Sequence, residues 1–464
     1  MKARLTASFA ALKGRLAAGA AFVGAALALA ACGSTPGPDY DDGARGTSPT
    51  IVTEAPSRYD RKNFIEPPHL YGQEPVRVGL LLPFSAQSED VRAVAASLFD
   101  AAQLAAFDAG DVNFLIIPKD TKGEPGAAAA AARSALAEGA EILLGPLFSE
   151  SVAAVAEVAR AADKSVIAFS SDLAAAGNGV YLLSHPPELE IARVTDYAVL
   201  NGYDRFGLLA PETEYGERVS QSFSEEVFAR GGVVVHTERY IQDPQAMLEP
   251  ARRFAKYSQE VIPLEQRPEY QDTLARRAAI AAGEAPPPQE TELPDDSGYV
   301  RGYNAVMIAE QGTLLRALAP LLPYYDVDIQ NIKLLGVSMW NNPQLTREPA
   351  LRGGWFAAPD PAMAEPFKRR YRDVFGAAPS RLASLSYDAT LLAAKLAREG
   401  NRRNRFDPEG ITDPAGFLGA DGLFRLRPDG RIERGLAVME LTPSGIEIID
   451  PAPRTFEDQA FYQY

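Results

Sequence analysis

The stretch that decides the fold runs from Val76 to Gly110, VRVGLLLPFSAQSEDVRAVAASLFDAAQLAAFDAG. It opens with a short apolar run, continues through a turn and ends in a long alanine-rich segment with helical periodicity. A strand that is buried on both faces has such a near-continuous apolar sequence, as the parallel strands of α/β proteins do. We therefore expect a β-strand followed by an α-helix at this point of the chain.

The same alternation continues downstream of Gly110. Residues 112–172 repeat it twice, with apolar runs of four to seven residues between helical patterns of twelve or more. Residues 204–240 restart it after Gly202, with no change of composition between the two regions. Strands that alternate with helices predict parallel sheets covered by helices. The expected fold class is α/β, with two doubly wound lobes on parallel sheets and functional sites at the carboxyl ends of the strands.

The first 31 residues have the pattern of an export signal. Four basic residues lead the chain: Lys2, Arg4, Lys13 and Arg15. The apolar run that follows, 16–31, is shorter than the roughly 20 residues that a helix needs to cross a bilayer. It therefore predicts a signal peptide over 1–31 rather than a stable membrane span.

Cys32, the single cysteine of the chain, stands directly after this run. Leu29 to Cys32, LAAC, resembles the bacterial lipobox, in which the cysteine becomes the acylated first residue of a lipoprotein. Gly33 in the next position implies an outer-membrane destination, with the protein facing the periplasm. The alternative is an ordinary signal peptide that is cut near an unrelated cysteine. Residues 32–75 are expected to comprise the acylated Cys32 and a flexible linker, because they are rich in Pro, Gly, Ser, Thr and Asp.

The charge of the chain argues against nucleic acid as a partner. The formal net charge is −15, and loss of the four basic residues with the signal peptide brings it to −19. Such a surface repels phosphate backbones and anionic lipid headgroups. We therefore expect membrane attachment through the lipid anchor and no nucleic-acid binding.

The sequence contains no assembled catalytic or metal-binding motif. The three histidines, His69, His185 and His236, lie far apart in the chain. The spacings HExxH, CxxC and GxSxG are absent, and no glycine-rich loop follows the first predicted strand. We expect no enzyme activity, no metal and no cofactor, although spacing alone leaves open a hydrolase that uses two carboxylates.

Three loops that follow predicted strands resemble those of a known family. ILLGPLFSESVAAVA, SVIAFSSD and PETEYGERVSQSF are similar to successive loops of the type I periplasmic binding proteins for branched-chain amino acids, whose two lobes close through a hinge on a small ligand. The resemblance implies ligand-binding residues at Ser149 or Ser151, at Ser170 or Ser171, at Tyr215 and at Glu310. One hydroxyl of each serine pair would hold the ligand carboxylate, the tyrosine would cover the ligand, and the glutamate would meet its ammonium group. The alternative for the serines is a structural role at the caps of helices.

A second resemblance lies further along the chain. Gly336 to Pro343, GVSMWNNP, and Leu351 to Pro361, LRGGWFAAPDP, are similar to segments of the bacterial lipoproteins that activate penicillin-binding proteins, whose body has the same two-lobed fold. Trp340 and Trp355 are the family-motif residues. This resemblance implies a non-enzymatic regulator that binds and activates a penicillin-binding protein, a peptidoglycan synthase, in the periplasm. The alternative is a substrate-binding protein that delivers an amino acid or related small ligand to an ABC transporter.

These patterns give an expected domain organisation. Lobe 1 comprises 76–190 and 359–430, and lobe 2 comprises 191–358 and 431–450. A charged helical and Pro-rich acidic insertion interrupts lobe 2 at about 251–300, and 451–464 form a C-terminal tail. Tyr387 and Asp388, which resemble the family's Y-D-A element, are expected to cap a helix and pack the lobes. A hairpin that turns at Asp429 and Gly430 is expected to complete the hinge side of lobe 2.

Overall fold

The computed structural model describes residues 75–110, 113–258, 275, 278–283, 302–401 and 404–459. The predicted signal peptide, Cys32 and almost all of the predicted linker lie outside these residues, as does most of the predicted insertion. The described ranges all fall within one compact unit, Ser57–Tyr464. Within them, no helix combines the length and apolar character that crossing a membrane requires.

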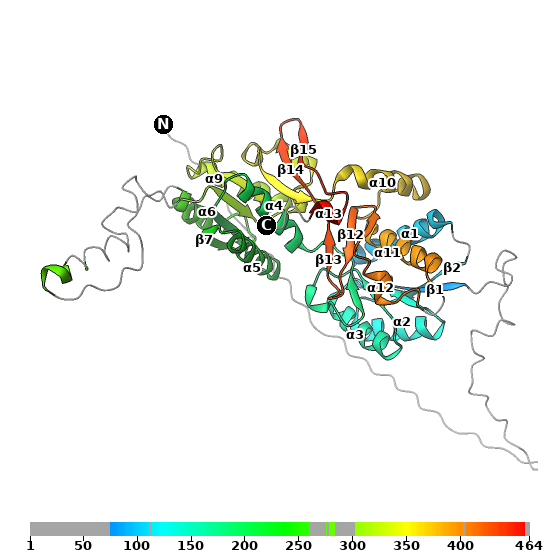
Figure 1. The fold of residues 1–464 in the computed structure, drawn as a ribbon. Helices are drawn as coiled ribbons and strands as arrows, with labels where there is room; N and C mark the ends of the chain where they lie inside the picture. The colour runs from blue at the N-terminus through cyan, green and yellow to red at the C-terminus, as the bar shows by residue number, and fades with distance from the viewer. Residues whose placement is uncertain are drawn as a thin grey trace, which may run out of the picture. The chain divides into compact units, whose positions relative to one another are not determined.

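Lobe 1 is built on a parallel sheet of five strands in the order β2-β1-β3-β4-β5. The strands are β1 (Val76–Leu82), β2 (Phe114–Asp120), β3 (Ile142–Leu144), β4 (Val166–Ala168) and β5 (Val180–Leu182). The helices are α1 (Glu89–Ala109), α2 (Pro125–Ala137), α3 (Ser149–Ala161) and, from far along the chain, α11 (Ala383–Glu399). Helices α1 and α11 lie side by side over one face of the sheet, and α2 and α3 cover the other (Figure 1).

The sequence of the central strand β1 is almost entirely apolar because helices cover both of its faces. Leu80 and Leu82 pack beneath α1 and α11, while Leu81 packs beneath α2 and α3. A β-carbon at Gly79 would lie 2.7 Å from Leu143 Cδ2 and 2.9 Å from Ala135 Cβ, so helix α2 approaches the strand too closely for any side chain there. Because both faces are covered, the strand lacks the polar alternation of a half-exposed one.

Lobe 2 is built on a mixed sheet of seven strands in the order β15-β14-β10-β9-β8-β6-β7. The strands are β6 (Arg205–Pro211), β7 (Val233–Tyr240), β8 (Ala305–Ile308), β9 (Lys333–Gly336), β10 (Trp355–Ala358), β14 (Ala437–Thr442) and β15 (Gly445–Asp450). The first five pair in parallel, and β14 and β15 add an antiparallel edge. One face is covered by α4 (Pro187–Leu200) and α5 (Glu214–Ala229), and the other by α6 (Leu248–Ala255), α8 (Gly312–Leu318) and α9 (Leu321–Tyr324). The expected α/β fold of two doubly wound lobes is confirmed.

The last strands differ from the sequence-based boundaries. β11 (Phe417–Gly419), β12 (Gly422–Leu426) and β13 (Ile432–Arg434) form a small antiparallel sheet of their own. The side chains of Phe424 and Ile432 join the core of lobe 1, so the predicted boundary between 430 and 431 cuts through one hairpin. Only the following hairpin, β14 and β15, completes lobe 2, because it pairs with β10. At the other crossing, α4 begins at Pro187; its buried apolar residues join the core of lobe 2, and Leu189 also packs against the core of lobe 1.

The predicted insertion also begins too early. Residues 251–258 belong to α6 and the short helix η4 (Lys256–Ser258). Ala251 and Phe254 are fully buried in the core of lobe 2, where Phe254 stacks on Tyr303 with ring centroids 4.7 Å apart. The charged residues between them misled the sequence interpretation, since they lie on the opposite face of an amphipathic helix.

The segment 361–399 forms a helix, a turn and a second helix. Helix α10 (Pro361–Phe375) packs on α1, ends at Gly376 in the left-handed conformation (φ +71°), and the chain re-enters lobe 1 as α11. Asp388 lies one turn inside α11 and accepts a hydrogen bond from the Ala420 amide at 2.6 Å, so it packs rather than caps the helix. The remaining short helices are η3 (Leu173–Ala175), η6 (Ser338–Trp340), η7 (Pro343–Arg347), η8 (Pro349–Leu351), α12 (Pro408–Ile411) and α13 (Phe456–Gln459).

Candidate functional site

A cavity of about 490 Å³ lies where the two lobes meet, and we call it the cleft cavity. Lobe 1 lines it with residues that follow the carboxyl ends of β3, β4 and β5 and with the start of α11, and lobe 2 lines it with the first turns of α5. The carboxyl edge of a parallel sheet is where α/β folds bind ligands. Its lining residues are Leu147, Phe148, Ser149, Phe169, Ser170, Ser171, Asp172, Ser184, His185, Glu214, Tyr215, Arg218, Arg381, Leu382 and Leu385.

Ser149 reaches this cavity because of a tight turn after β3. Gly145 has φ +85°, and a β-carbon there would lie 2.3 Å from the carbonyl oxygen of Leu81, so this position requires glycine. Helix α3 then starts with Phe148 as its N-cap and no side-chain capping bond. Ser149 is therefore the first helical residue rather than the cap, and the amides of the helix N-terminus remain available to an anion.

Ser170 and Ser171 follow β4 and both line the cavity. The Ser170 hydroxyl accepts a hydrogen bond from the Asp172 amide at 3.2 Å, and the Asp172 carboxylate caps η3 by accepting from the Ala174 amide at 3.0 Å. Ser170 thus stabilises the turn before η3 without capping that helix, and it also lines the cavity.

Tyr215 comes to the cavity from lobe 2. Thr213 caps α5 by accepting a hydrogen bond from the Gly216 amide at 3.1 Å. A β-carbon at Gly216 would lie 1.9 Å from the carbonyl oxygen of Pro211, so only glycine permits this close start of the helix. Burial, with a contribution from the nearby Glu190, raises the pKa of the Tyr215 phenol above its ordinary value, and the ring stays neutral.

Two of the predicted ligand residues lie off the cleft cavity. Ser151 is inside lobe 1 with 1% of its surface exposed, on the buried face of α3. Glu310 is inside lobe 2, where its carboxylate accepts hydrogen bonds from Tyr240 Oη and Gln242 Nε2, each at 3.1 Å. The sequence resemblance thus located the serine pair but could not say which member lines the cavity. Glu310 is absent from the cavity lining, and its carboxylate is already bonded.

The two arginines of the cleft cavity escaped the sequence analysis. Arg218 Nη2 donates to both carboxylate oxygens of Glu188, at 2.7 and 3.0 Å, and to the Ser171 carbonyl oxygen at 3.0 Å, which ties α5 to lobe 1. Arg381 is different: among the described residues, its side chain makes a 3.5 Å approach of Nη1 to Ser338 Oγ and forms no ion pair with a carboxylate, although its charge acts on the buried Glu190. Arg381 is therefore a cation with capacity for an added anion. Helical or strand periodicity could not have pointed to Arg381, because this residue lies in a loop.

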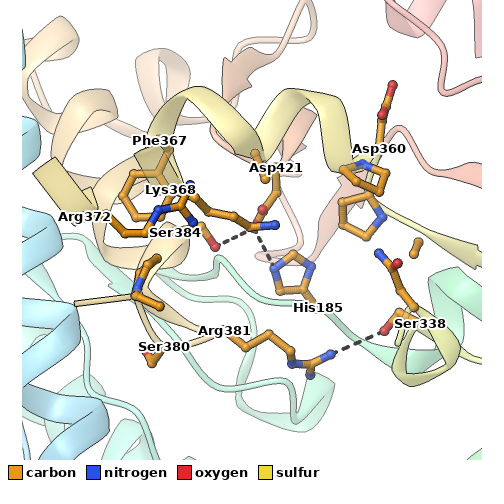
Figure 2. A pocket seen from close by; sticks show the side chains of 17 residues that line it. His185, Ser338, Asp360, Phe367, Lys368, Arg372, Ser380, Arg381, Ser384 and Asp421 are labelled. Carbon is orange, nitrogen blue, oxygen red and sulfur yellow. Dashed lines mark hydrogen bonds and ion pairs between the residues drawn. The ribbon is translucent and has the colours of Figure 1, made fainter. Parts of the chain in front are cut away.

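A buried polar cluster lies beneath the cavity at the hinge. His185 Nε2 is 3.0 Å from Asp421 Oδ2, and the Ser384 hydroxyl donates to the same oxygen (Figure 2). Burial, followed by the repulsion of Arg434, lowers the pKa of His185 to about 4. Burial raises the pKa of Asp421, but the hydrogen bond and charge of His185, the charge of Arg434 and the Ser384 bond together bring it to about 2. Neutral histidine therefore faces ionised aspartate at pH 7.

The order of contacts in this cluster rules out a serine protease-like triad. A catalytic serine must donate to the histidine, which in turn donates to the aspartate. Here Ser384 and His185 both bind Asp421, so the hydroxyl has no base. Among the residues that the structure describes, no group of three or more His, Cys, Asp or Glu is arranged to hold a metal ion.

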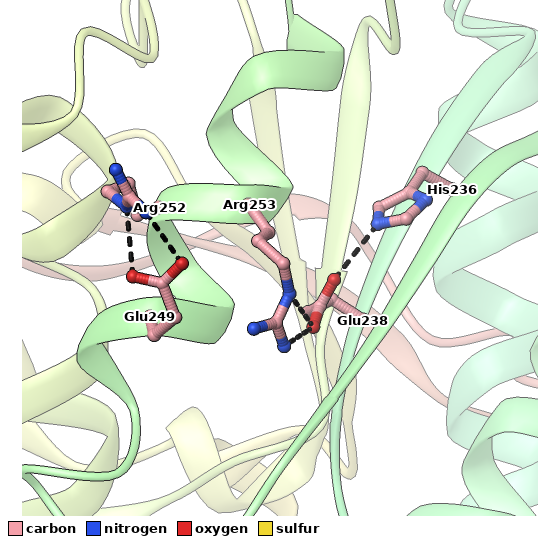
Figure 3. Close-up of polar contacts among 5 residues, drawn as sticks. All are labelled: His236, Glu238, Glu249, Arg252 and Arg253. Carbon is pink, nitrogen blue, oxygen red and sulfur yellow. Dashed lines mark hydrogen bonds and ion pairs between the residues drawn. The ribbon is translucent and has the colours of Figure 1, made fainter.

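His236, the other described histidine, has a structural setting on the edge strand β7. Its Nε2 is 3.1 Å from Glu238 Oε2, and its ring stacks on Tyr257 at 3.7 Å between centroids. Arg253 of α6 donates from Nε to the other oxygen of Glu238 at 3.0 Å (Figure 3). These contacts hold α6 on the sheet and leave the imidazole outside any cavity described above.

Trp340 and Trp355, the residues of the second resemblance, are core residues of lobe 2. Trp340 is fully buried and donates from Nε1 to the Glu310 carbonyl oxygen at 3.1 Å. Trp355 is 8% exposed, packs edge-on against Tyr197 with centroids 4.9 Å apart, and donates to Glu440 Oε2 at 2.7 Å. Their burial in the core of lobe 2 leaves neither ring available for contact with a partner.

Comparison with known proteins supports this architecture. Residues 75–255 match a family model described as periplasmic binding protein. An uncharacterized protein of Rickettsia prowazekii is 28% identical over 115 residues, which is 25% of this chain and 31% of that protein.

Solved structures resemble most of the chain. A putative branched-chain amino acid ABC transporter protein from Rhodospirillum rubrum matches with a TM-score of 0.63 and 16% identity, over 81% of this chain and 100% of that one. The branched-chain amino acid transporter substrate-binding protein of Streptococcus pneumoniae, solved with isoleucine, matches with a TM-score of 0.51 and 16% identity, over 82% and 100%. These matches lend no support to the expected penicillin-binding protein partner. The chain thus has the two-lobed α/β fold of the type I periplasmic binding proteins, and its residues 75–255 match the family model of periplasmic binding proteins.

Proposed function

We propose that the chain is a binding protein for a small carboxylate-bearing solute, an amino acid or a related molecule, enclosed between its lobes. The observation that carries the proposal is the cleft cavity, in which Ser149, Ser170, Ser171 and Tyr215 meet Arg381. Its volume of about 490 Å³ lies within the roughly 300 to 1,000 Å³ of ligand pockets. The Streptococcus pneumoniae relative in fold was solved with isoleucine.

The polar groups on the lobe 1 side suit a carboxylate. The N-terminus of α3 presents amides without a side-chain cap, next to the Ser149 hydroxyl. Arg381 lines the same cavity and lacks a carboxylate partner among the described residues. Guanidinium and helix amides bind anions by charge-assisted hydrogen bonds, which are stronger inside a cavity than in water.

The lobe 2 side offers groups for a cationic end of the ligand. Glu214, in the first turn of α5, lines the cavity and is exposed, and Asp172 lines it opposite, although its carboxylate already caps η3. We assign the contact with an ammonium group to Glu214 rather than Glu310, because Glu310 lies off the cavity and already accepts bonds from Tyr240 and Gln242. Opposite charges at the two ends favour a zwitterion.

Calorimetric titration with the common amino acids, their 2-oxo acids and small aromatic carboxylates tests this proposal. A ligand at 100 times its dissociation constant stabilises the native state by about 2.7 kcal/mol, which thermal unfolding detects independently. Arg381→Gln should weaken a carboxylate ligand by about ten- to a hundredfold, the loss of one hydrogen bond to a charged group. Arg369→Gln, on the exposed face of α10, is the matched control.

The results that contradict the proposal are equally definite. If no compound of the panel binds, or if Arg381→Gln and Arg369→Gln reduce affinity equally, the cleft cavity is not a carboxylate site. A folded variant is verified beforehand by its unfolding transition.

Regulation of a penicillin-binding protein remains a second candidate, supported by the similarity of GVSMWNNP and LRGGWFAAPDP to activator lipoproteins. Since Trp340 and Trp355 are buried, a partner surface must lie elsewhere on the chain. This candidate includes export, acylation at Cys32 and an outer-membrane location, because these would place the two lobes in the periplasm with the synthase. The chain from Gly33 onward, used as bait on an envelope extract, should retain a protein labelled by fluorescent penicillin; retention equal to that by a control bait contradicts this candidate.

A further inference from the structure

A second cavity, of about 380 Å³, shares part of its wall with the cleft cavity, and we call it the α10 pocket. Its walls are one face of α10, the loop between α10 and α11, and residues of the hinge (Figure 2). The cleft cavity and the α10 pocket share Arg381 and His185, and the rest of their linings differ.

The α10 pocket is preformed. Phe367 and Tyr371 anchor α10 on α1 through apolar contact. The loop after α10 is held by the Ser380 amide, which donates to Ser97 Oγ at 2.8 Å, and Ser97 Oγ is in turn 3.1 Å from Tyr371 Oη. A wall that is fixed by its own hydrogen bonds loses little conformational entropy when a ligand binds.

One polar atom in the wall lacks a partner. The Ser380 side-chain oxygen is buried and forms no hydrogen bond with any of the residues that the structure describes. Ser380 lines the α10 pocket. A buried hydroxyl without a partner is costly, so a ligand or water that hydrogen bonds to it is favoured.

The charges around the α10 pocket select an anion. Lys368, Arg372 and Arg381 line it, against two acids, Asp360 and Asp421. Both acids are already bonded: Asp360 caps α10 by accepting from the Ala362 amide at 2.9 Å, and Asp421 accepts from Ser384 and His185.

The basic side chains are more loosely held. Lys368 and Arg372 share Glu365, at 3.4 and 3.9 Å, and all three are about half exposed. Such solvent-exposed ion pairs are weak, so a bound anion can compete for the two cations.

The remaining wall is apolar. Phe367, Ala364 and three prolines, Pro359, Pro361 and Pro379, face the same space. A ligand that satisfies this lining has an apolar body as well as an anionic group.

We propose that the α10 pocket is a second binding site, separate from the cleft cavity, for a small organic anion that combines an apolar body with a carboxylate or phosphate group. Lys368 and Arg372 hold the anionic group, Ser380 donates a hydrogen bond to the ligand, and Phe367 packs on its body. Because Arg381 lines both cavities, occupancy of the α10 pocket changes the affinity of the cleft cavity, and the reverse holds to the same factor.

Titration calorimetry of the mature chain with phenyl phosphate and with benzoate tests this site, and inorganic phosphate serves as the anion without an apolar body. Arg372→Gln should weaken at least one organic probe by about tenfold, as should Lys368→Gln. Arg369→Gln removes the same charge from the exposed face of the same helix and should leave the affinity within about twofold. Ala378→Phe, on the exposed loop that lines the pocket, should abolish binding by filling it.

Blocking the other cavity separates this site from the proposed function. Ser149→Trp narrows the cleft cavity and should leave the organic probes bound in the α10 pocket. The inference is overturned if neither organic probe saturates below about 10 mM, if inorganic phosphate binds as tightly as both, or if Arg369→Gln weakens binding as much as Arg372→Gln. It is also overturned if Ser149→Trp abolishes binding while Ala378→Phe does not, since the probes then occupy the cleft cavity alone.

Discussion

The stability of Glu190→Gln relative to wild type should increase as the pH rises. Glu190 lies in the first turn of α4 with 5% of its surface exposed, and its Oε2 accepts a hydrogen bond from the Ser338 amide at 2.8 Å. Burial raises the pKa of its carboxyl from 4.5 to about 7, although the Ser338 bond and the nearby Arg381 act in the opposite direction.

The sign follows from proton binding. A carboxyl whose pKa is higher in the folded state binds more protons there, so the stability it contributes is present below pH 4.5 and is lost as the pH rises through 7. A difference of roughly 2.5 pKa units corresponds to about 3 kcal/mol. Glutamine keeps an acceptor oxygen for the Ser338 amide and carries no charge. The unfolding free energy of Glu190→Gln relative to wild type should therefore increase by about 3 kcal/mol between pH 4 and pH 9.

Urea denaturation at several pH values measures this difference. Trp340 and Trp355, the chain's two tryptophans, are both buried in lobe 2, so their fluorescence reports the unfolding of the lobe that contains Glu190. Glu225→Gln, exposed on the neighbouring helix α5, controls for the loss of one negative charge. A difference that stays flat with pH, or one that follows Glu225→Gln, refutes the reasoning that burial destabilises the ionised form of Glu190.

Three further predictions concern the helix start, the core and the anchor. Gly216→Ala forces a β-carbon against the Pro211 carbonyl oxygen, so it should lower the unfolding free energy by about 1 to 3 kcal/mol and weaken cleft ligands by moving Tyr215; unchanged thermal unfolding contradicts this. Phe254→Ala, at a fully buried ring, should cost about 3 to 5 kcal/mol in urea unfolding, whereas truncation of Phe228, which is 83% exposed, should cost under about 0.5 kcal/mol. Cys32→Ala should abolish incorporation of a clickable fatty acid and release the protein from membranes; continued labelling shows that acylation is elsewhere.

The strand pattern made the architecture predictable. The apolar run of β1 and the alanine-rich face of α1 are local signals. A fully apolar strand must be buried on both faces, and a helix that packs on it covers one of them. The sequence signal for the hairpin at Gly430 was equally local, but the lobe to which the hairpin belongs could not be predicted from it. β13 stays with lobe 1 because Ile432 packs against residues of the first sheet, which lie far from it in the sequence.

The candidate site was predictable in part. The resemblance to periplasmic binding proteins pointed to Ser149, Ser170, Ser171 and Tyr215, all of which line the cleft cavity. The choice between Ser149 and Ser151 depended on which helical face looks inward, and Glu310 depended on the packing of Tyr240 and Gln242 around it. Arg381 had no sequence signal, since nothing local distinguishes a free guanidinium from a paired one.

The sequence by itself determined the two α/β lobes, the order of their strands along the chain and the glycine-dependent turns, since these follow from backbone sterics and from burial within a few residues. The tertiary structure alone decided what those turns face. Arg218 from α5 reaches Ser171 of lobe 1, and Arg381, from the loop before α11, lines two cavities, because folding brings together groups that are remote in sequence. Electrostatic attraction and desolvation depend on distance in space, and a sequence pattern records only distance along the chain.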